Sequence, residues 1–174
     1  MRKMLRAWKR DEQAVVALEV GLLMPLMLLI LMSIVDMGNA ILTNQKILTA
    51  SQTVADLLGR EAVVSNGILN DSVEAGKLAM MPYDTSSFGI DVAGIQYGTG
   101  PQQPLLRWRE TVNMQSNDNA VNGSKGLGAA GEGVLVVTVQ YVFEPYFSGI
   151  FTGNVRMQEI SYVRGRNGLY IPRV

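Results

Sequence analysis

The sequence contains no cysteine and no histidine among its 174 residues. A chain without cysteine has no disulfides and no thiol nucleophile, and a chain that also lacks histidine is without the two commonest zinc ligands. Histidine is the commonest general base as well, so its absence argues against an acid–base enzyme. Stability must therefore come from packing, and we expect neither a metal nor a cofactor.

A predominance of one charge is also missing, because 15 Lys and Arg residues balance 15 Asp and Glu residues. The basic residues that do cluster lie in the first ten positions: Arg2, Lys3, Arg6, Lys9 and Arg10. Beyond residue 36 no basic patch is interleaved with aromatic side chains. We therefore expect no nucleic-acid partner.

One long apolar run dominates the sequence: residues 14–35, AVVALEVGLLMPLMLLILMSIV, with one charge at Glu19 and a proline at Pro25. As a helix these residues extend about 33 Å, enough to cross a hydrocarbon core of about 30 Å. The basic cluster precedes the run, so the positive-inside rule predicts a cytoplasmic N-terminus and export of residues 36–174. A secretory signal peptide cut after Ala40 is the alternative, although the run is longer than such peptides need and carries a charge.

Glu19 is the exception within this run. A carboxylate in a membrane helix costs about 2.5–3.5 kcal/mol on insertion scales, so such a residue usually has a partner or a function. Two explanations are open. Either Glu19 lies close enough to the cytoplasmic interface to reach it, or it pairs with a positive charge that processing of the chain creates.

The stretch RDEQAVVALEVGLLMP resembles the processing region of type IV pilins, and specifically the TadE-like minor pilin or pseudopilin family of the tight-adherence (Tad/Flp, type IVb-like) pilus system. In that family a basic leader ends in a small residue, usually Gly, at which a prepilin peptidase cuts. A Glu is the fifth mature residue, and an aromatic residue and later a proline follow it. The resemblance implies that Ala14 ends the leader, that Val15 is the new N-terminus, that Glu19 is the fifth mature residue and that Pro25 is the family's proline. Ala14 replaces the usual Gly, and Val20 replaces the usual Phe or Tyr.

By this resemblance, strongest over residues 10–62, the chain is a pseudopilin that supports pilus assembly, adherence and biofilm formation. The expected partners are a prepilin peptidase, other pilin and pseudopilin subunits, the assembly platform with its ATPase, and the lipid bilayer. The expected location is the bacterial inner membrane, crossed once, with the C-terminal domain in the periplasm; entry into the pilus itself is left open. Cleavage would leave an ammonium group at Val15, which Glu19 of the same or a neighbouring subunit would meet in a low-dielectric helix bundle.

Helical periodicity continues past the apolar run and predicts one helix over residues 13–64. Its expected core stripe is Met37, Ile41, Leu48, Ala55, Leu58 and Ala62, flanked by Ile47 and Val54. The turn-forming sequence Ser65-Asn66-Gly67 is expected to end this helix. Asp71 to Glu74 has the spacing of a capping box and predicts a short second helix that stops before Pro82.

From residue 88 the apolar period changes to two, which predicts strands over residues 88–97, 106–113, 134–143 and 156–163. The third run should turn Leu135, Val137, Val139, Tyr141 and Phe143 to one face. We predict an α+β, pilin-like fold in which an antiparallel sheet of about four strands packs on the long helix. The expected segments are a leader (1–14), a transmembrane helix (15–36), a helical extension with the second helix (37–80) and an exported sheet domain (81–174).

The connections carry three weaker signals. Gly126, Gly128 and Gly131, in the polar loop 114–133, match G-x-G-x-x-G, but a strand follows them where a dinucleotide site needs a helix. The apolar connection 146–151 is expected to cover one end of the core, with contact to a neighbouring subunit as the alternative. The arginine-containing tail 165–174 is expected to be a solvated end or a contact for an acidic partner.

A membrane-tethered periplasmic enzyme or ligand-binding domain is the alternative function. Its candidate groups are carboxylates without paired spacing: Asp84, Asp91, Glu110, Glu132 and Glu144. Glu110 interrupts the apolar face of its strand and is expected to be solvated. No Cys, His or Ser-Lys motif accompanies these acids, so we expect no enzyme and no catalytic residue.

Overall fold

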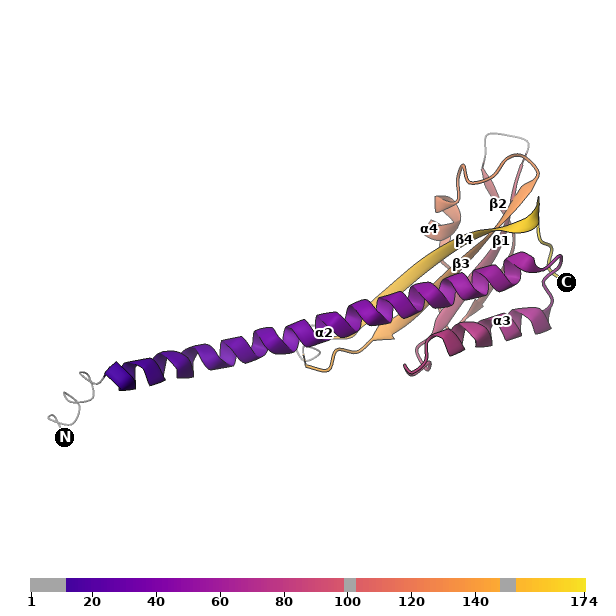
Figure 1. Cartoon of the computed structure of the whole chain (residues 1–174). Coiled ribbons are helices and arrows are strands. Elements are labelled where there is room, and N and C mark those ends of the chain that lie inside the picture. The colour runs from indigo at the N-terminus through magenta and orange to yellow at the C-terminus, as the bar shows by residue number, and fades with distance from the viewer. Residues whose placement is uncertain (1–11, 99–102, 148–152) are drawn as a thin grey trace.

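The computed structural model describes residues 12–98, 103–147 and 153–174. A long helix leads into a second helix and a four-stranded antiparallel sheet (Figure 1). This confirms the predicted α+β class. The elements in chain order are α2 (Glu12–Arg60), α3 (Asn66–Ala79), β1 (Gly89–Tyr97), β2 (Pro104–Val112), α4 (Asp118–Gly123), β3 (Glu132–Phe143) and β4 (Val155–Leu169).

The helix α2 is continuous over 49 residues and contains Pro25. Its second half packs on the sheet and on α3, whereas its first half projects away from the rest of the chain (Figure 1). The helix ends at Arg60, four residues before the predicted end. Val64 instead forms a parallel bridge with the C-terminal tail, in which its N–H donates to the carbonyl of Pro172 at 2.9 Å. A helical backbone at this residue would not leave these groups available.

The buried face of α2 differs from the predicted stripe. Met37 is 68% exposed and Ile41 is 55% exposed, and Leu48 and Ala62 are exposed as well. The core instead takes Ile47, Ala50, Val54, Ala55 and Leu58, of which two were assigned to the flanks. Two polar side chains, Thr43 and Ser51, are fully buried on the same face. The stripe prediction is confirmed for Ala55 and Leu58 and was wrong for the other four residues. It counted only apolar residues, whereas the position of the sheet decides which face is covered.

The second helix begins earlier than the capping-box spacing predicted. Ser65 is its N-cap, and the Ser65 hydroxyl accepts a hydrogen bond from the Ile68 N–H at 3.3 Å. The segment 65–67 therefore begins α3, whereas it was expected to end α2. Ser65 can take this role because Ser is as good an N-cap as Asp. The predicted stop before Pro82 is confirmed. Gly76 brings α3 close to α2, because a Cβ there would lie 2.7 Å from the Val54 side chain.

The sheet has the order β2-β1-β3-β4, and every neighbouring pair is antiparallel. The predicted core face of β3 is confirmed, because Leu135, Val137, Val139 and Tyr141 share one apolar cluster with α2 and α3. The opposite face carries a second, smaller cluster from Ala93, Ile95, Tyr97, Val134 and Val136, closed by Ala120 of α4. Residues 114–133 were expected to form a loop, but they contain the short helix α4. As expected, a strand follows the loop glycines, since β3 begins at Glu132.

The C-terminal tail is packed against the domain, so the expectation of a solvated end was wrong. Ile171 is buried, and its carbonyl accepts a hydrogen bond from the Trp108 indole N–H at 2.9 Å. The Arg173 guanidinium lies 5.9 Å from the Trp108 ring centroid and 3.0 Å from the Glu110 carboxylate, and it also donates to the Asn66 side chain at 2.7 Å. Glu110 is therefore paired, although its side chain keeps an exposed fraction of 41%. The tail ties β2 to the start of α3.

Deleting residues 171–174 should destabilise the domain. The deletion exposes the space filled by Ile171, worth about 2 kcal/mol, and removes the acceptor of Trp108 and two backbone bonds to Val64, each worth about 1 kcal/mol. We expect the free energy of unfolding of the detergent-solubilised chain to fall by about 5 kcal/mol in denaturant titrations followed by circular dichroism. The exposed Arg156→Ala on β4 is the control and should change it by less than about 0.5 kcal/mol. Equal stability of the truncated and full chains would contradict the packed tail.

Candidate functional site

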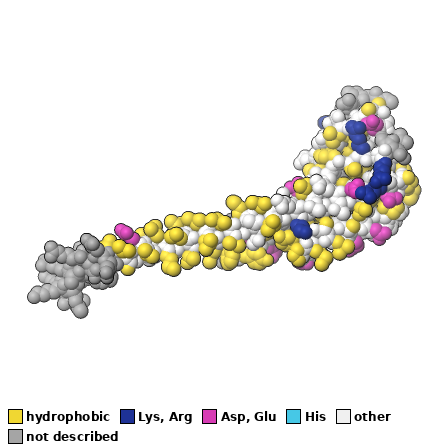
Figure 2. Space-filling model, in the orientation of Figure 1, with side chains coloured by type: hydrophobic (Ala, Val, Ile, Leu, Met, Phe, Trp, Pro, Cys, Tyr) yellow, Lys and Arg dark blue, Asp and Glu magenta, His cyan; other side chains and the backbone are white. Residues whose placement is uncertain are grey.

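The projecting half of α2 is the most unusual surface of this protein. Every side chain from residue 15 to residue 35 is exposed. Nearly all of them are apolar, as the yellow surface of the projecting helix shows (Figure 2). This helix is long and apolar enough to cross a membrane. Exposed apolar area of this extent is unfavourable in water by about 25 cal/mol per Å². Lipid or other apolar helices must therefore surround it.

The predicted processing residues lie at the start of this surface. The Ala14–Val15 peptide bond lies in α2, close to its first described residue, Glu12. Val15 and Glu19 are four residues apart, so they share one face of the helix one turn from each other. Glu19 is exposed and, within the described residues, forms no ion pair or hydrogen bond. The carboxylate is thus accessible to a partner from outside.

Pro25 interrupts the hydrogen bonding of the same surface. Proline has no N–H, so the carbonyl of Gly21, four residues earlier, is without its usual donor. The space around Gly21 is open, because a Cβ built there meets no atom within 4 Å. The sequence analysis named the proline and overlooked this glycine, although the spacing of four was visible in the sequence. The pair makes residues 21–25 the least strongly bonded part of the apolar helix.

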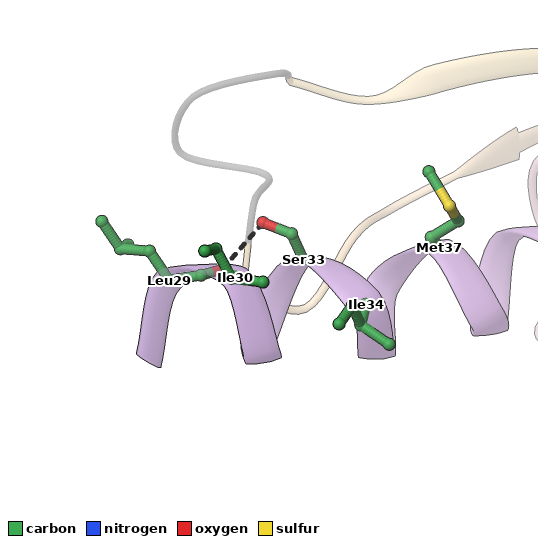
Figure 3. Close-up of a pocket in the computed structure, with 5 residues that line it drawn as sticks. All are labelled: Leu29, Ile30, Ser33, Ile34 and Met37. Atoms are coloured by element: carbon green, nitrogen blue, oxygen red, sulfur yellow. Dashed lines mark hydrogen bonds between the residues drawn. The ribbon is translucent and has the colours of Figure 1, made fainter. Parts of the chain in front are cut away.

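A shallow apolar concavity of about 260 Å³ lies nearer the domain, lined by Leu29, Ile30, Ser33, Ile34 and Met37 (Figure 3). The Ser33 hydroxyl donates to the carbonyl of Leu29 at 2.8 Å, so its polarity is satisfied within the helix. A surface of this kind is compatible with lipid or with another apolar helix. It offers no polar group that would orient a small ligand.

Asp36, the first residue after the apolar run, joins the helix to the connection between β3 and β4. Its carboxylate accepts hydrogen bonds from the backbone N–H of Tyr146 at 2.9 Å and of Phe147 at 3.0 Å. Only 4% of Asp36 is exposed, whereas Tyr146 and Phe147 are 78% and 45% exposed. These two aromatics therefore do not cover the core, contrary to expectation, and the rest of the connection 146–151 lies outside the described residues. Only contacts between distant parts of the chain identify Asp36.

Two further contacts fix the domain on the helix. The Ser51 and Ser161 hydroxyls lie 2.8 Å apart, and the Asn44 side chain donates to the Glu159 carboxylate at 2.8 Å. Both join α2 to the edge strand β4. The projecting half of α2 is therefore held in a fixed direction relative to the sheet.

The carboxylates considered for an enzyme all have structural roles: Asp84, Asp91, Glu110, Glu132 and Glu144. Asp84 is typical, because hydrogen bonds from the Ser86 hydroxyl and N–H lower the pKa of its carboxyl. Glu132 accepts the N–H of Ala129 in the turn before β3, and Glu144 accepts from Asn154. In the described part of the chain no three or more acidic side chains are grouped so that they could hold a metal ion.

Asp91 is the one deeply buried acid of this set, with 2% exposure. It lies 3.1 Å from the Arg109 guanidinium and accepts the Asn117 N–H at 2.8 Å, just before α4. Arg109 also reaches the exposed Asp118 at 2.6 Å. This ion pair holds α4 over the second apolar cluster.

Asp91→Asn should therefore affect stability. Breaking a buried pair from one side costs about 3–5 kcal/mol, and Asp118 retains part of the charge balance of Arg109. We expect a loss of about 2 kcal/mol in the free energy of unfolding, measured by denaturant titration in detergent. Glu144→Gln, at an exposed acid, is the matched control and should leave stability unchanged. An unchanged midpoint for Asp91→Asn would contradict the structural role of this acid.

Comparison with known proteins supports the resemblance found in the sequence. The family model described as TadE-like protein matches residues 14–56, which include Ala14, Val15, Glu19 and Pro25. No curated protein and no solved structure matches the chain. The match is a likeness to TadE-like proteins over this segment, and it suggests an association with the tight-adherence pilus. Among the residues that the structure describes, one helix, near the N-terminus, is apolar and long enough to fit a single-pass membrane anchor.

Proposed function

We propose that this chain, whose residues 14–56 match the TadE-like family, is a minor pilin or pseudopilin of a tight-adherence (Flp-type) pilus. The observation that carries the proposal is the fully exposed apolar half-helix, attached rigidly to a small packed domain. A helix of this kind can be held in a bilayer before assembly and can pack against the helices of other subunits after it. Adherence and biofilm formation follow as roles of the pilus that it helps to build.

The proposed maturation is a single cut between Ala14 and Val15 by a prepilin peptidase. Position 14 carries a small side chain, and the basic residues of the leader precede it. The basic leader stays in the cytoplasm, which places the sheet domain in the periplasm of a bacterial host. The proposed segments remain the leader (1–14), the transmembrane helix (15–36), the helical part (37–80) and the exported sheet (81–174). The last two share one core.

The proposed chemistry of assembly is one ion pair. The new amino group of Val15 would be a cation at the membrane surface, and Glu19, one turn away, is exposed and has no partner among the described residues. When the carboxylate of one subunit pairs with the ammonium group of its neighbour, burying the two charges costs less free energy than burying each of them alone. Since such a pair forms in only one axial register, it also sets the rise between subunits. The partners implied are other pilin and pseudopilin subunits, delivered by the assembly platform and its ATPase.

Processing can be tested at position 14. We expect the protein purified from host membranes to begin at Val15, as read by N-terminal sequencing and intact mass. Ala14→Leu should leave the precursor uncut, because a bulky side chain does not fit a peptidase site that takes Gly or Ala. The matched control is Ala17→Leu, which adds the same bulk on the mature side and should still be cut. Wild-type protein that retains Met1 contradicts the processing proposal.

The ion pair can be tested at position 19. Glu19→Leu removes an insertion cost of about 2.5–3.5 kcal/mol, so membrane insertion should be unchanged or improved. Incorporation into pili and piliation of the cells should be lost, measured by immunoblotting of sheared pili and by electron microscopy. Glu61→Leu, at an exposed acid just beyond α2, is the control and should assemble normally. Normal piliation with Glu19→Leu would remove the assembly role of this carboxylate.

A further inference from the structure

The connection between β3 and β4 reaches back along α2 to the end of the apolar run. β3 ends at Phe143, and the chain then lies against the helix where Tyr146 and Phe147 donate their N–H groups to Asp36. Asp36 directly follows Val35, the last residue of the exposed apolar half. Figure 3 shows the two strand ends passing beside this part of α2. Tyr146 and Phe147 are therefore level with the exported end of the proposed span.

The length of the span places these aromatics at a defined depth. Residues 15–35 extend about 31 Å as a helix, which matches a hydrocarbon core of about 30 Å. The headgroup region of the exported leaflet then begins near Asp36 and occupies roughly the next 5–8 Å. Tyr146 and Phe147 are held within this layer by their hydrogen bonds to Asp36.

The side chains at this level suit the membrane interface better than water. Tyr146 is 78% exposed and Phe147 is 45% exposed, and Met37, the residue after Asp36, and Val155, the first residue of β4, are exposed as well. Tyrosine is enriched at membrane interfaces because its ring is apolar and its hydroxyl is polar. Asp36 accepts the backbone N–H groups of both aromatics, so these groups need no hydrogen-bond partner from the membrane.

We propose that Tyr146 and Phe147 form a second membrane contact, inserting into the headgroup layer of the exported leaflet, and that Asp36 is the residue that positions them. The occupant of this surface is a phospholipid bilayer, because the patch is continuous with the apolar half of α2. The contact fixes the height and tilt of the sheet domain above the membrane before assembly. The inference rests on the proposed function only in that residues 15–35 span the bilayer.

The absence of cysteine makes the test direct, because each introduced cysteine carries the only nitroxide label. The full chain is reconstituted in vesicles of phosphatidylethanolamine and phosphatidylglycerol, labelled at Tyr146→Cys or Phe147→Cys. Leu29→Cys is the reference inside the span, and Leu105→Cys, on β2 and 45% exposed, is the reference in water. Collision of each label with oxygen and with a water-soluble nickel chelate is measured by power-saturation electron paramagnetic resonance.

We expect labels at 146 and 147 to collide several-fold less with the nickel chelate than the label at Leu105, and to gain oxygen collisions. Nickel collisions equal to those at Leu105, with Leu29 shielded, would overturn the inference and leave the anchor intact. Low collision with both reagents would also overturn it, because it indicates a contact with a second protein copy. A label at Leu29 that is open to the chelate would instead refute the span, and with it the proposed function.

The role of Asp36 is tested in the same vesicles with Asp36→Ala added to Tyr146→Cys. In Asp36→Ala, release of the connection should sharpen the spectrum of the label and raise its nickel collisions several-fold. In Asp36→Asn both changes should be smaller, since one side-chain oxygen remains as an acceptor. Asp56→Ala, at an exposed acid of the same helix, is the control. The Leu29 label should not change in any of these variants. An unchanged Tyr146 label in Asp36→Ala would show that Asp36 does not position the aromatics.

Discussion

A single continuous helix that must satisfy two different surroundings is the constraint on which the whole structure depends. The first half of α2 is exposed and apolar throughout, so it needs lipid or apolar helices around it. The second half is covered on one face by the sheet and α3, with Ile47, Val54 and Leu58 at zero exposure. Because no turn separates the two halves, the direction of the apolar half fixes the direction of the domain. In the same way, the direction of the domain fixes that of the apolar half. This rigid coupling is what a subunit needs if its position in an assembly is set through the helix alone.

Polar contacts hold α2 where its exposed apolar half meets the half that is packed on the sheet. They come from the connection between β3 and β4 and from β4 itself. Asp36 accepts backbone N–H groups of Tyr146 and Phe147, and Asn44 and Ser51 pair with Glu159 and Ser161 on β4. An edge strand presents unpaired backbone groups that invite association with other chains. Here α2 contacts β4 and packs on the face of the sheet, so β4 helps to fix the helix.

Sequence patterns located part of the candidate site and missed the rest for a definite physical reason. Ala14, Val15, Glu19 and Pro25 were named from a local pattern, and the family match covers all four. Asp36 looked like an ordinary polar residue after a membrane span, because nothing near it in the sequence indicates that it accepts N–H groups about 110 residues away. The same holds for Arg173, whose partners Glu110, Trp108 and Asn66 come from two other elements.

The sequence by itself determined the properties that depend on near neighbours along the chain. These are the long apolar helix, the four strands and their positions along the chain, and the face of β3 that enters the core. Each follows from the spacing of apolar residues, which repeats every 3.6 residues in a helix and every two in a strand. Only the tertiary structure decided which face of α2 is buried, where α3 begins, that α4 covers the second cluster, and that the tail is packed. Each of these depends on which distant surface competes for a given residue. Apolar Met37 stays exposed and polar Thr43 becomes buried because burial follows the position of the sheet and not hydrophobicity alone.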